Sequence, residues 1–170
     1  MTIFSTGVGL LVAVVLGTAA VAKIREPGPF VTAVRTLVPA KAAKPVAWIV
    51  IGAESLAAIA SLLPITLGFG LALAVVLFGA FAAVAVRSAK APAPLPCACF
   101  GRVKTSLGWP HAIRNLLLTL LAASGLAAVV LGGSGAAWSQ PAVMMLVAAI
   151  ALVLAAIAIS IDHLIALFAS

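Results

Sequence analysis

Residues Ile65–Val86 read ITLGFGLALAVVLFGAFAAVAV, an uninterrupted apolar segment without a charged side chain. A transmembrane helix needs about 20 predominantly apolar residues, so this segment is long enough to cross a bilayer. Inside the hydrocarbon every backbone polar group must be bonded within the segment, which favours a helix over a strand. Its small residues, among them Gly68, Gly70 and Gly79, would let neighbouring helices approach it closely.

Apolar segments of similar length recur along the whole chain. With Ile65–Val86 they predict five membrane-spanning helices, the others being Phe4–Ala22, Val46–Leu63, Ile113–Leu131 and Val143–Ile161. Of the 170 residues, 65% are hydrophobic and 8% are charged, which excludes a soluble globular domain and a disordered chain. We therefore expect an all-α integral membrane protein in which residues 1–170 form a single domain, a small helical bundle in a lipid bilayer.

The distribution of charge predicts the orientation of these helices. Ten Lys and Arg residues against three Asp and Glu give a formal net charge of +7. The loop cations follow the first and the third predicted span: Lys23, Arg25, Arg35, Lys41 and Lys44, then Arg87, Lys90, Arg102 and Lys104. The positive-inside rule places both connections in the cytoplasm, with the N-terminus outside and the C-terminus inside a multi-pass plasma-membrane protein. Basic residues at these positions set topology, so no nucleic-acid partner is expected.

A short interfacial helix is predicted after the first span. The apolar residues there recur at helical spacing, with Pro29 at the start and Pro39 at the end. They are Phe30, Val34, Leu37 and Val38. An amphipathic helix lying on the membrane surface fits this pattern, and an irregular loop is the alternative.

The sequence PCACFG at 96–101 contains both cysteines of the chain, Cys97 and Cys99. On a helix these side chains would point to different sides, whereas a tight turn, favoured by the proline before and Gly101 after, brings them into bridging range. A disulfide across one intervening residue would be strained, and strained disulfides exchange readily. The nearby cations Arg102 and Lys104 would favour the thiolate form. The pattern indicates a redox-active pair.

The cysteines also have other interpretations. They could be small apolar residues that only fill space. A zinc site needs four ligands, and only His111 and His163 are available besides the cysteines. Copper(I) could use the two thiolates with Met144 or Met145, which lie in a different predicted helix. We therefore predict no metal site.

Glu54 is the second candidate site residue. It lies eight residues after Val46 and therefore about 12 Å into a hydrocarbon core about 30 Å thick. An unpaired carboxylate is costly there, so we expect Glu54 to reach a polar group, with Lys23 and Arg114 entering the membrane from the same side. Asn115 could form a hydrogen bond between helices. The cluster could lock three helices together, carry a proton, or hold a protonated Glu54.

The sequence resembles the methylamine-utilisation MauE family, which is grouped with DoxX-like membrane proteins. The resemblance covers roughly residues 7–131 and rests on Gly17, Glu54 and these motifs: AKI at 22–24, PGPF at 27–30, CACFG at 97–101, LGW at 107–109 and RNLLL at 114–118. It implies a four-helix DoxX-like core followed by a C-terminal helix. The name-giving members act with a thioredoxin-like partner in maturing a disulfide-rich exported enzyme subunit.

The resemblance also implies roles for the residues of this chain that match the family motifs. Cys97 and Cys99 would be the redox pair. The family-typical polar positions within the helices, of unknown role, would be Lys23, Glu54, Arg114 and Asn115. The leading hypothesis is then a thiol–disulfide oxidoreductase or electron relay, with a thioredoxin-fold partner and no identified cofactor.

Two other functional hypotheses use the same residues differently. In one, the chain is a non-enzymatic accessory or scaffold subunit of a membrane complex, and the cysteines are structural. In the other, it is a small transporter or a quinone-linked subunit that depends on Glu54. The charge pattern places the cysteines in the cytoplasm, although disulfides of an exported client form outside. Three explanations are compatible with this pattern: electrons cross the membrane, the cysteine loop folds back into the bundle, or the topology is inverted.

Overall fold

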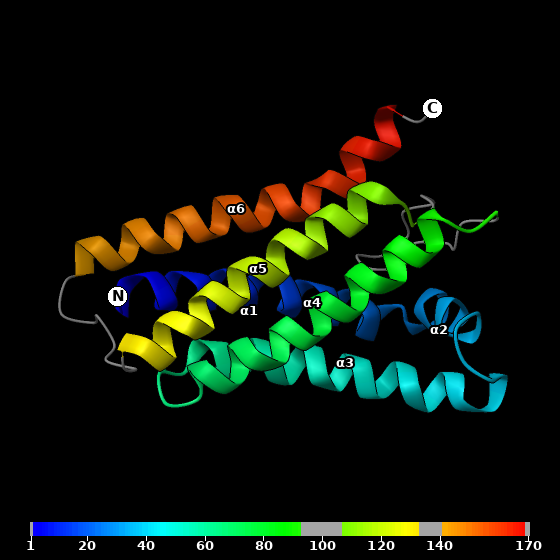
Figure 1. Ribbon diagram of the computed structural model, residues 1–170, viewed down its shortest axis with the longest axis horizontal. Helices are drawn as coiled ribbons and strands as arrows, with labels where there is room; N and C mark the ends of the chain where they lie inside the picture. The colour runs from blue at the N-terminus through cyan, green and yellow to red at the C-terminus, as the bar shows by residue number, and fades with distance from the viewer. Residues whose placement is uncertain (1, 93–106, 133–140, 169–170) are drawn as a thin grey trace.

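In this computed structural model, the chain is described over residues 2–92, 107–132 and 141–168. These residues form six helices: α1 Thr2–Arg25, α2 Pro27–Arg35, α3 Ala40–Leu62, α4 Leu67–Ala89, α5 Trp109–Gly132 and α6 Pro141–Phe168. Five of them are long and run side by side, and the short α2 lies beside the first turns of α3 (Figure 1). The described part contains no strand, so the predicted all-α fold is confirmed.

Four helices are long and apolar enough to span a membrane: Ile3–Arg25, Ala40–Leu62, Leu67–Ala89 and Trp109–Gly132. They match the first four predicted spans and imply a lipid bilayer around the protein. The fifth predicted span falls on α6. The apolar part of α6 whose side chains the structure describes is Met145–Ser160, which is shorter than the roughly 20 residues that a span needs.

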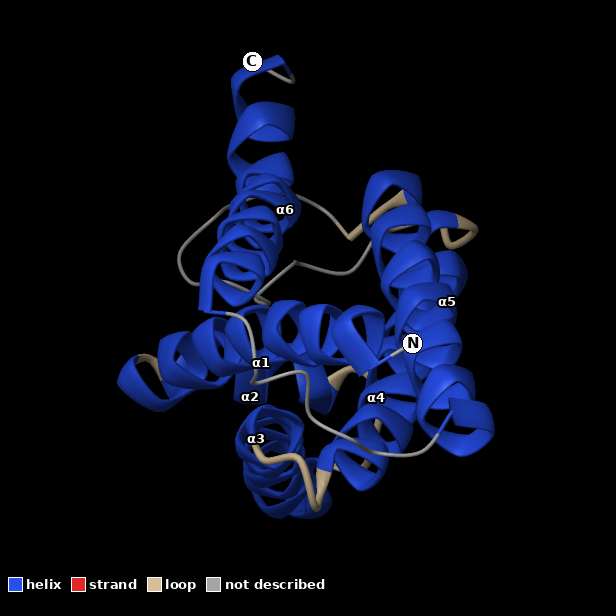
Figure 2. Cartoon of the chain, turned by 90° about the vertical axis from the view of Figure 1, so that its left-hand side faces the viewer, coloured by secondary structure: helices blue, strands red, loops and turns tan. Residues whose placement is uncertain are grey.

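The helix α1 occupies the centre of the bundle. Figure 2 shows it with α3, α4, α5 and α6 around it, and it contacts each of them. In its most apolar stretch 56% of the residues are buried, compared with 28–39% in the other three spans. Val12 and Leu16 pack at its centre against Leu71 and Phe78 of α4 and Ala122 of α5. The outer faces of the other helices carry exposed Leu, Ile and Val side chains, as contact with lipid requires.

The interfacial helix predicted after the first span is present as α2. It begins at Pro27, two residues before the predicted start, because a proline in the first turn needs no hydrogen-bonded N–H. Its buried residues Phe30 and Val34 pack against α3. The α3 residues on this contact are Ala43, Ala47 and Ile51. Because α2 covers this stretch, α3 extends as a helix from Ala40, six residues before the apolar segment begins at Val46.

One end of the bundle, which we call the basic end, collects the described loop cations. There α1 and α4 end and α3 and α5 begin (Figure 1). Its exposed cations are Arg25, Arg35, Lys41, Lys44, Arg87 and Lys90. Residues 63–66, which join α3 to α4 at the opposite end, contain no charged residue.

At that opposite end, three helices touch through their backbones. A Cβ atom added to Gly70 of α4 would lie 2.6 Å from the backbone nitrogen of Ser61 on α3. One added to Gly9 of α1 would lie 2.7 Å from the Ser61 carbonyl oxygen. Only glycine therefore fits at these two positions, and the contact of Gly9, Ser61 and Gly70 is the glycine junction of this fold.

Candidate functional site

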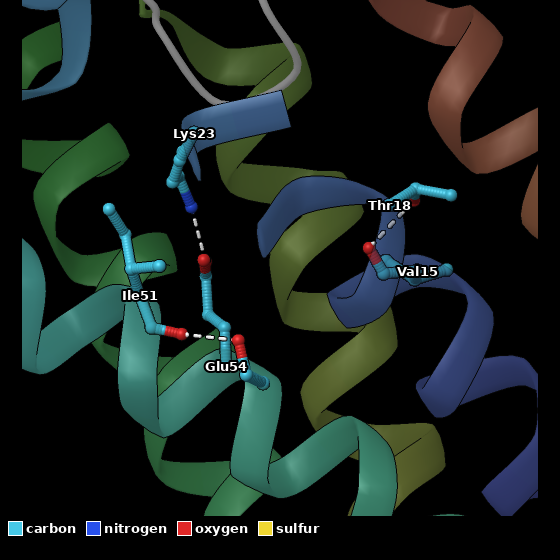
Figure 3. Close-up of polar contacts among 6 residues, drawn as sticks. Val15, Thr18, Lys23, Ile51 and Glu54 are labelled. Atoms are coloured by element: carbon cyan, nitrogen blue, oxygen red, sulfur yellow. Dashed lines mark hydrogen bonds and ion pairs between the residues drawn. The ribbon is translucent and has the colours of Figure 1, made fainter. Parts of the chain in front are cut away.

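The polar residues predicted inside the membrane meet in the interior of the bundle, toward the basic end. Lys23 on α1 and Glu54 on α3 form a buried salt bridge between Nζ and Oε1, and Figure 3 shows the two side chains pointing at one another. Their exposed fractions are 2% for Lys23 and 0% for Glu54. The predicted contact of Glu54 with a basic residue is confirmed, and Lys23 is that residue.

Two aromatic rings complete the surroundings of the lysine. Nζ of Lys23 lies 4.7 Å from the ring centre of Phe30 on α2 and 5.0 Å from that of Phe81 on α4. At these distances the face of each ring attracts the ammonium group, more strongly when water is excluded. Lys23 is thus held by three helices other than its own. The sequence contained no signal for this arrangement, because the residues are far apart along the chain.

Arg114 and Asn115 extend the cluster into α5. Both side chains are buried, with exposed fractions of 5% and 4%. Nη1 of Arg114 donates a long hydrogen bond of 3.4 Å to the carbonyl oxygen of Ala158 on α6. Nδ2 of Asn115 donates one of 2.8 Å to the His111 carbonyl oxygen, one turn earlier in α5. Arg114 therefore fastens α5 to α6, whereas Lys23 fastens α1 to α3.

A small cavity joins these side chains. It has a volume of about 20 Å³, and its polar lining residues are Lys23, Glu54, Arg114 and Asn115. Apolar side chains from α1, α4 and α5 form the rest of the wall, including Ala19 and Phe78. The four predicted polar positions are therefore brought together around one small space between the helices.

Comparison with known proteins gives the family of the chain. The family model described as methylamine utilisation protein MauE matches residues 1–128. The chain belongs to the MauE family. The match covers Lys23, Glu54, Arg114 and Asn115, and it ends inside α5, so α6 lies beyond it. Searches of curated proteins and of solved structures find no match.

In this MauE-family chain, the predicted redox and thiolate-stabilising residues lie outside the described part of the structure. They are Cys97, Cys99, Arg102 and Lys104. The described residues on either side of them are joined to one another. Oγ of Ser88, in the last turn of α4, donates a buried hydrogen bond of 2.7 Å to the carbonyl oxygen of Leu107. Residues 19 apart in sequence are thus fixed at one point of the basic end.

The start of α5 continues this attachment. Leu107 is buried with Ala85 of α4 and Ala112 of α5. The backbone N–H of Gly108 donates a hydrogen bond of 3.3 Å to Nδ1 of the buried His111. From the sequence, His111 was considered only as a possible metal ligand, and Ser88 was not identified. Within the described residues, no group of three or more His, Cys, Asp or Glu side chains could hold a metal ion.

Proposed function

We propose that this MauE-family membrane protein serves methylamine utilisation as an accessory thiol–disulfide redox protein, with Cys97 and Cys99 as its exchanging pair. The observation that carries the proposal is that both cysteines of the chain form one Cys-x-Cys sequence within the family match. The hydrogen bond between Ser88 and Leu107 supports it, because it attaches both flanks of the cysteine segment to the basic end of the bundle.

The proposed reaction is a dithiol–disulfide exchange with a thioredoxin-fold partner. A thiolate of the pair attacks the partner's disulfide, forms a mixed disulfide and releases one partner thiolate. The second cysteine, as thiolate, attacks the mixed disulfide and releases the other partner sulfur. The chain's two thiols are then oxidised to a disulfide, the partner's disulfide is reduced to a dithiol, and the two protons pass to the partner's thiolates. The reverse reaction uses the same steps.

In this proposal Arg102 and Lys104 favour the thiolate, and the buried cluster supports the pair from a distance. Lys23, Glu54, Arg114 and Asn115 hold α1, α3, α5 and α6 in register. No cofactor is needed for the exchange, because the partner supplies the disulfide. A quinone would be required only if it oxidised or reduced Cys97 and Cys99 between exchange reactions.

The test is to trap the mixed disulfide. Cys97→Ser and Cys99→Ser are made separately and expressed with a candidate thioredoxin-fold partner, and complexes are read on non-reducing gels. One single variant should accumulate a covalent complex that a reductant dissolves, because it keeps the attacking thiol and lacks the resolving one. The double variant is the matched control and should trap nothing. If neither single variant traps a partner and the double variant still matures the client, the cysteines are structural and the accessory-subunit hypothesis is favoured.

We also propose that the basic end faces the cytoplasm of the cell. Six exposed cations at that end, with no charged residue in the α3–α4 connection, support this orientation. Single cysteines are placed at Lys41 and at the fully exposed Ile65 in a chain with Cys97→Ser and Cys99→Ser. A membrane-impermeant maleimide should label position 65 in intact cells and position 41 only after lysis. The reverse pattern would invert the topology.

A further inference from the structure

The salt bridge uses only one of the two carboxylate oxygens of Glu54. Oε1 accepts from Lys23, whereas no donor among the described residues forms a hydrogen bond with the buried Oε2. The Lys23 ammonium group is occupied by this bond and by the faces of the Phe30 and Phe81 rings. A buried acceptor without a donor is costly, so Oε2 requires a partner from elsewhere.

The small cavity beside Glu54 restricts what that partner can be. A volume of about 20 Å³ exceeds the minimum of about 10–15 Å³ for one water molecule and is far below that of an organic ligand. The lining ammonium group of Lys23 and guanidinium group of Arg114 would repel a metal cation. An anion could not donate the hydrogen bond that Oε2 of Glu54 lacks. A neutral molecule of one heavy atom, able both to donate and to accept hydrogen bonds, fits these conditions.

The side chain of Asn115 offers the second contact. Its Nδ2 donates to the His111 carbonyl oxygen, and its Oδ1 is an acceptor in a residue that lines the same cavity. A water molecule can donate one hydrogen to Glu54 Oε2 and the other to Asn115 Oδ1. A buried water with two or more polar partners is a stable part of a protein interior.

We propose that the cavity is a specific binding site for a single water molecule, which bridges Glu54 on α3 to Asn115 on α5. The helices α3 and α5 each pack on α1 and α4, and the water provides a polar link between them. The link continues through Asn115 to His111 and Gly108, at the start of α5. The water site does not depend on the cysteines and goes beyond the proposed redox function.

The chain suits a direct test, because it contains only three acidic residues, of which two are glutamates. With 13C-labelled glutamate, the carboxyl region of a solid-state NMR spectrum of the full chain in liposomes shows two side-chain signals, and Glu26→Gln identifies that of Glu54. Polarisation is then transferred from water protons to these carbons. We expect transfer to Glu54 although its side chain is 0% exposed. Glu26, half-buried at the basic end, serves as the internal control.

Two variants separate bound water from the exchangeable ammonium protons of Lys23. Ala19→Val fills the cavity wall from α1, and Asn115→Leu removes the contact on α5, while both keep Lys23 and Glu54. In either variant the transfer to Glu54 should fall at least fivefold, while that to Glu26 stays the same. Absence of transfer to Glu54 in the unaltered chain overturns the proposal, as does unchanged transfer in a folded variant. The second variant decides the matter if the first does not fold.

Discussion

The two ends of the bundle are held together by different interactions. Toward the basic end, α1 and α3 are joined by the Lys23–Glu54 salt bridge, with aromatic rings around the lysine. At the opposite end, α1, α3 and α4 are joined at the glycine junction, where the backbones of Gly9, Ser61 and Gly70 are in contact. The first contact is directional and polar, whereas the second depends on the absence of side chains.

The difference shows two solutions to one physical problem. Lipid tails are as apolar as Leu side chains, so the hydrophobic effect does not drive helices together within a bilayer. Close packing at glycine and hydrogen bonds between buried polar groups remain available, and this chain uses one at each end. A polar contact fails when its partner is removed, and a glycine contact fails when an atom is added. Substitutions of these two kinds should therefore act at different ends.

The largest effect is expected where a buried charge loses its partner. Lys23→Met leaves the fully buried Glu54 uncompensated, which should cost about 3–5 kcal/mol of unfolding free energy. The measurement is unfolding by SDS in mixed micelles, followed by circular dichroism. The double variant Lys23→Met/Glu54→Gln should recover most of this loss, because no net charge then remains. A single variant as stable as the parent would mean that the salt bridge does not hold this end.

The glycine junction should respond next most strongly. Gly70→Ala places a methyl group 2.6 Å from a backbone nitrogen that cannot move aside, and overpacking of this kind costs about 1–3 kcal/mol. Gly52→Ala is the matched control, because nothing lies within 4 Å of its added Cβ atom. The control should change stability by less than about 0.5 kcal/mol in the same SDS titration. Equal effects of the two substitutions would contradict the described contact.

A smaller effect tests the attachment at the basic end. Ser88→Ala removes the buried donor to the Leu107 carbonyl oxygen and should cost about 1–1.5 kcal/mol, near the upper end of the net contribution of one neutral hydrogen bond. Ser124→Ala is the control, because Ser124 bonds only locally to Leu121 and is exposed. Hydrogen exchange of the Gly108 and His111 amides should accelerate in Ser88→Ala and stay unchanged in the control. Unchanged protection in both would show that the bond does not fix the start of α5.

The smallest effect concerns the rings around the lysine. Phe81→Leu keeps an apolar side chain but removes one aromatic face from Nζ of Lys23, at a cost of about 0.5–1 kcal/mol. Phe69→Leu is the control on the same helix, because Phe69 is exposed on the outer face. In a Lys23→Met background the difference between the two variants should disappear. A difference that persists there would arise from packing rather than from attraction to the charge.

The sequence predicted those features that follow from composition and from the cost of charge in lipid. Four spans, the short helix α2 and the pairing of Glu54 with a basic residue on its side of the membrane were all derived in this way. The choice between Lys23 and Arg114 could not be derived, because both entered from the same side. In the structure Lys23 forms the salt bridge with Glu54, whereas Arg114 donates to the Ala158 carbonyl oxygen of α6.

The glycines are a second case in which the sequence did not determine which residue makes the contact. Gly68, Gly70 and Gly79 all suggested close helix packing, yet only Gly70 of these three has no room for a side chain. The added Cβ atom would lie 3.5 Å from its nearest neighbour at Gly68 and 4.0 Å at Gly79. Which glycine faces a backbone is set by the rotation of α4 about its axis. That rotation results from the packing of the whole bundle, as does the approach of Phe30 and Phe81 to Lys23.

The salt bridge also has a consequence for the order of events during synthesis. Its partners lie 31 residues apart, and at about 5–20 residues per second the ribosome adds such a length in about 2–6 s. During that interval Glu54 has not yet been synthesised, so Lys23 lacks its salt-bridge partner. The long side chain of Lys23 can keep its ammonium group among the lipid headgroups. The lysine is drawn into the bundle only when α3 arrives. The packing of α1, the first helix to be synthesised, is therefore completed only by contact with α3. The central position of α1 is established late.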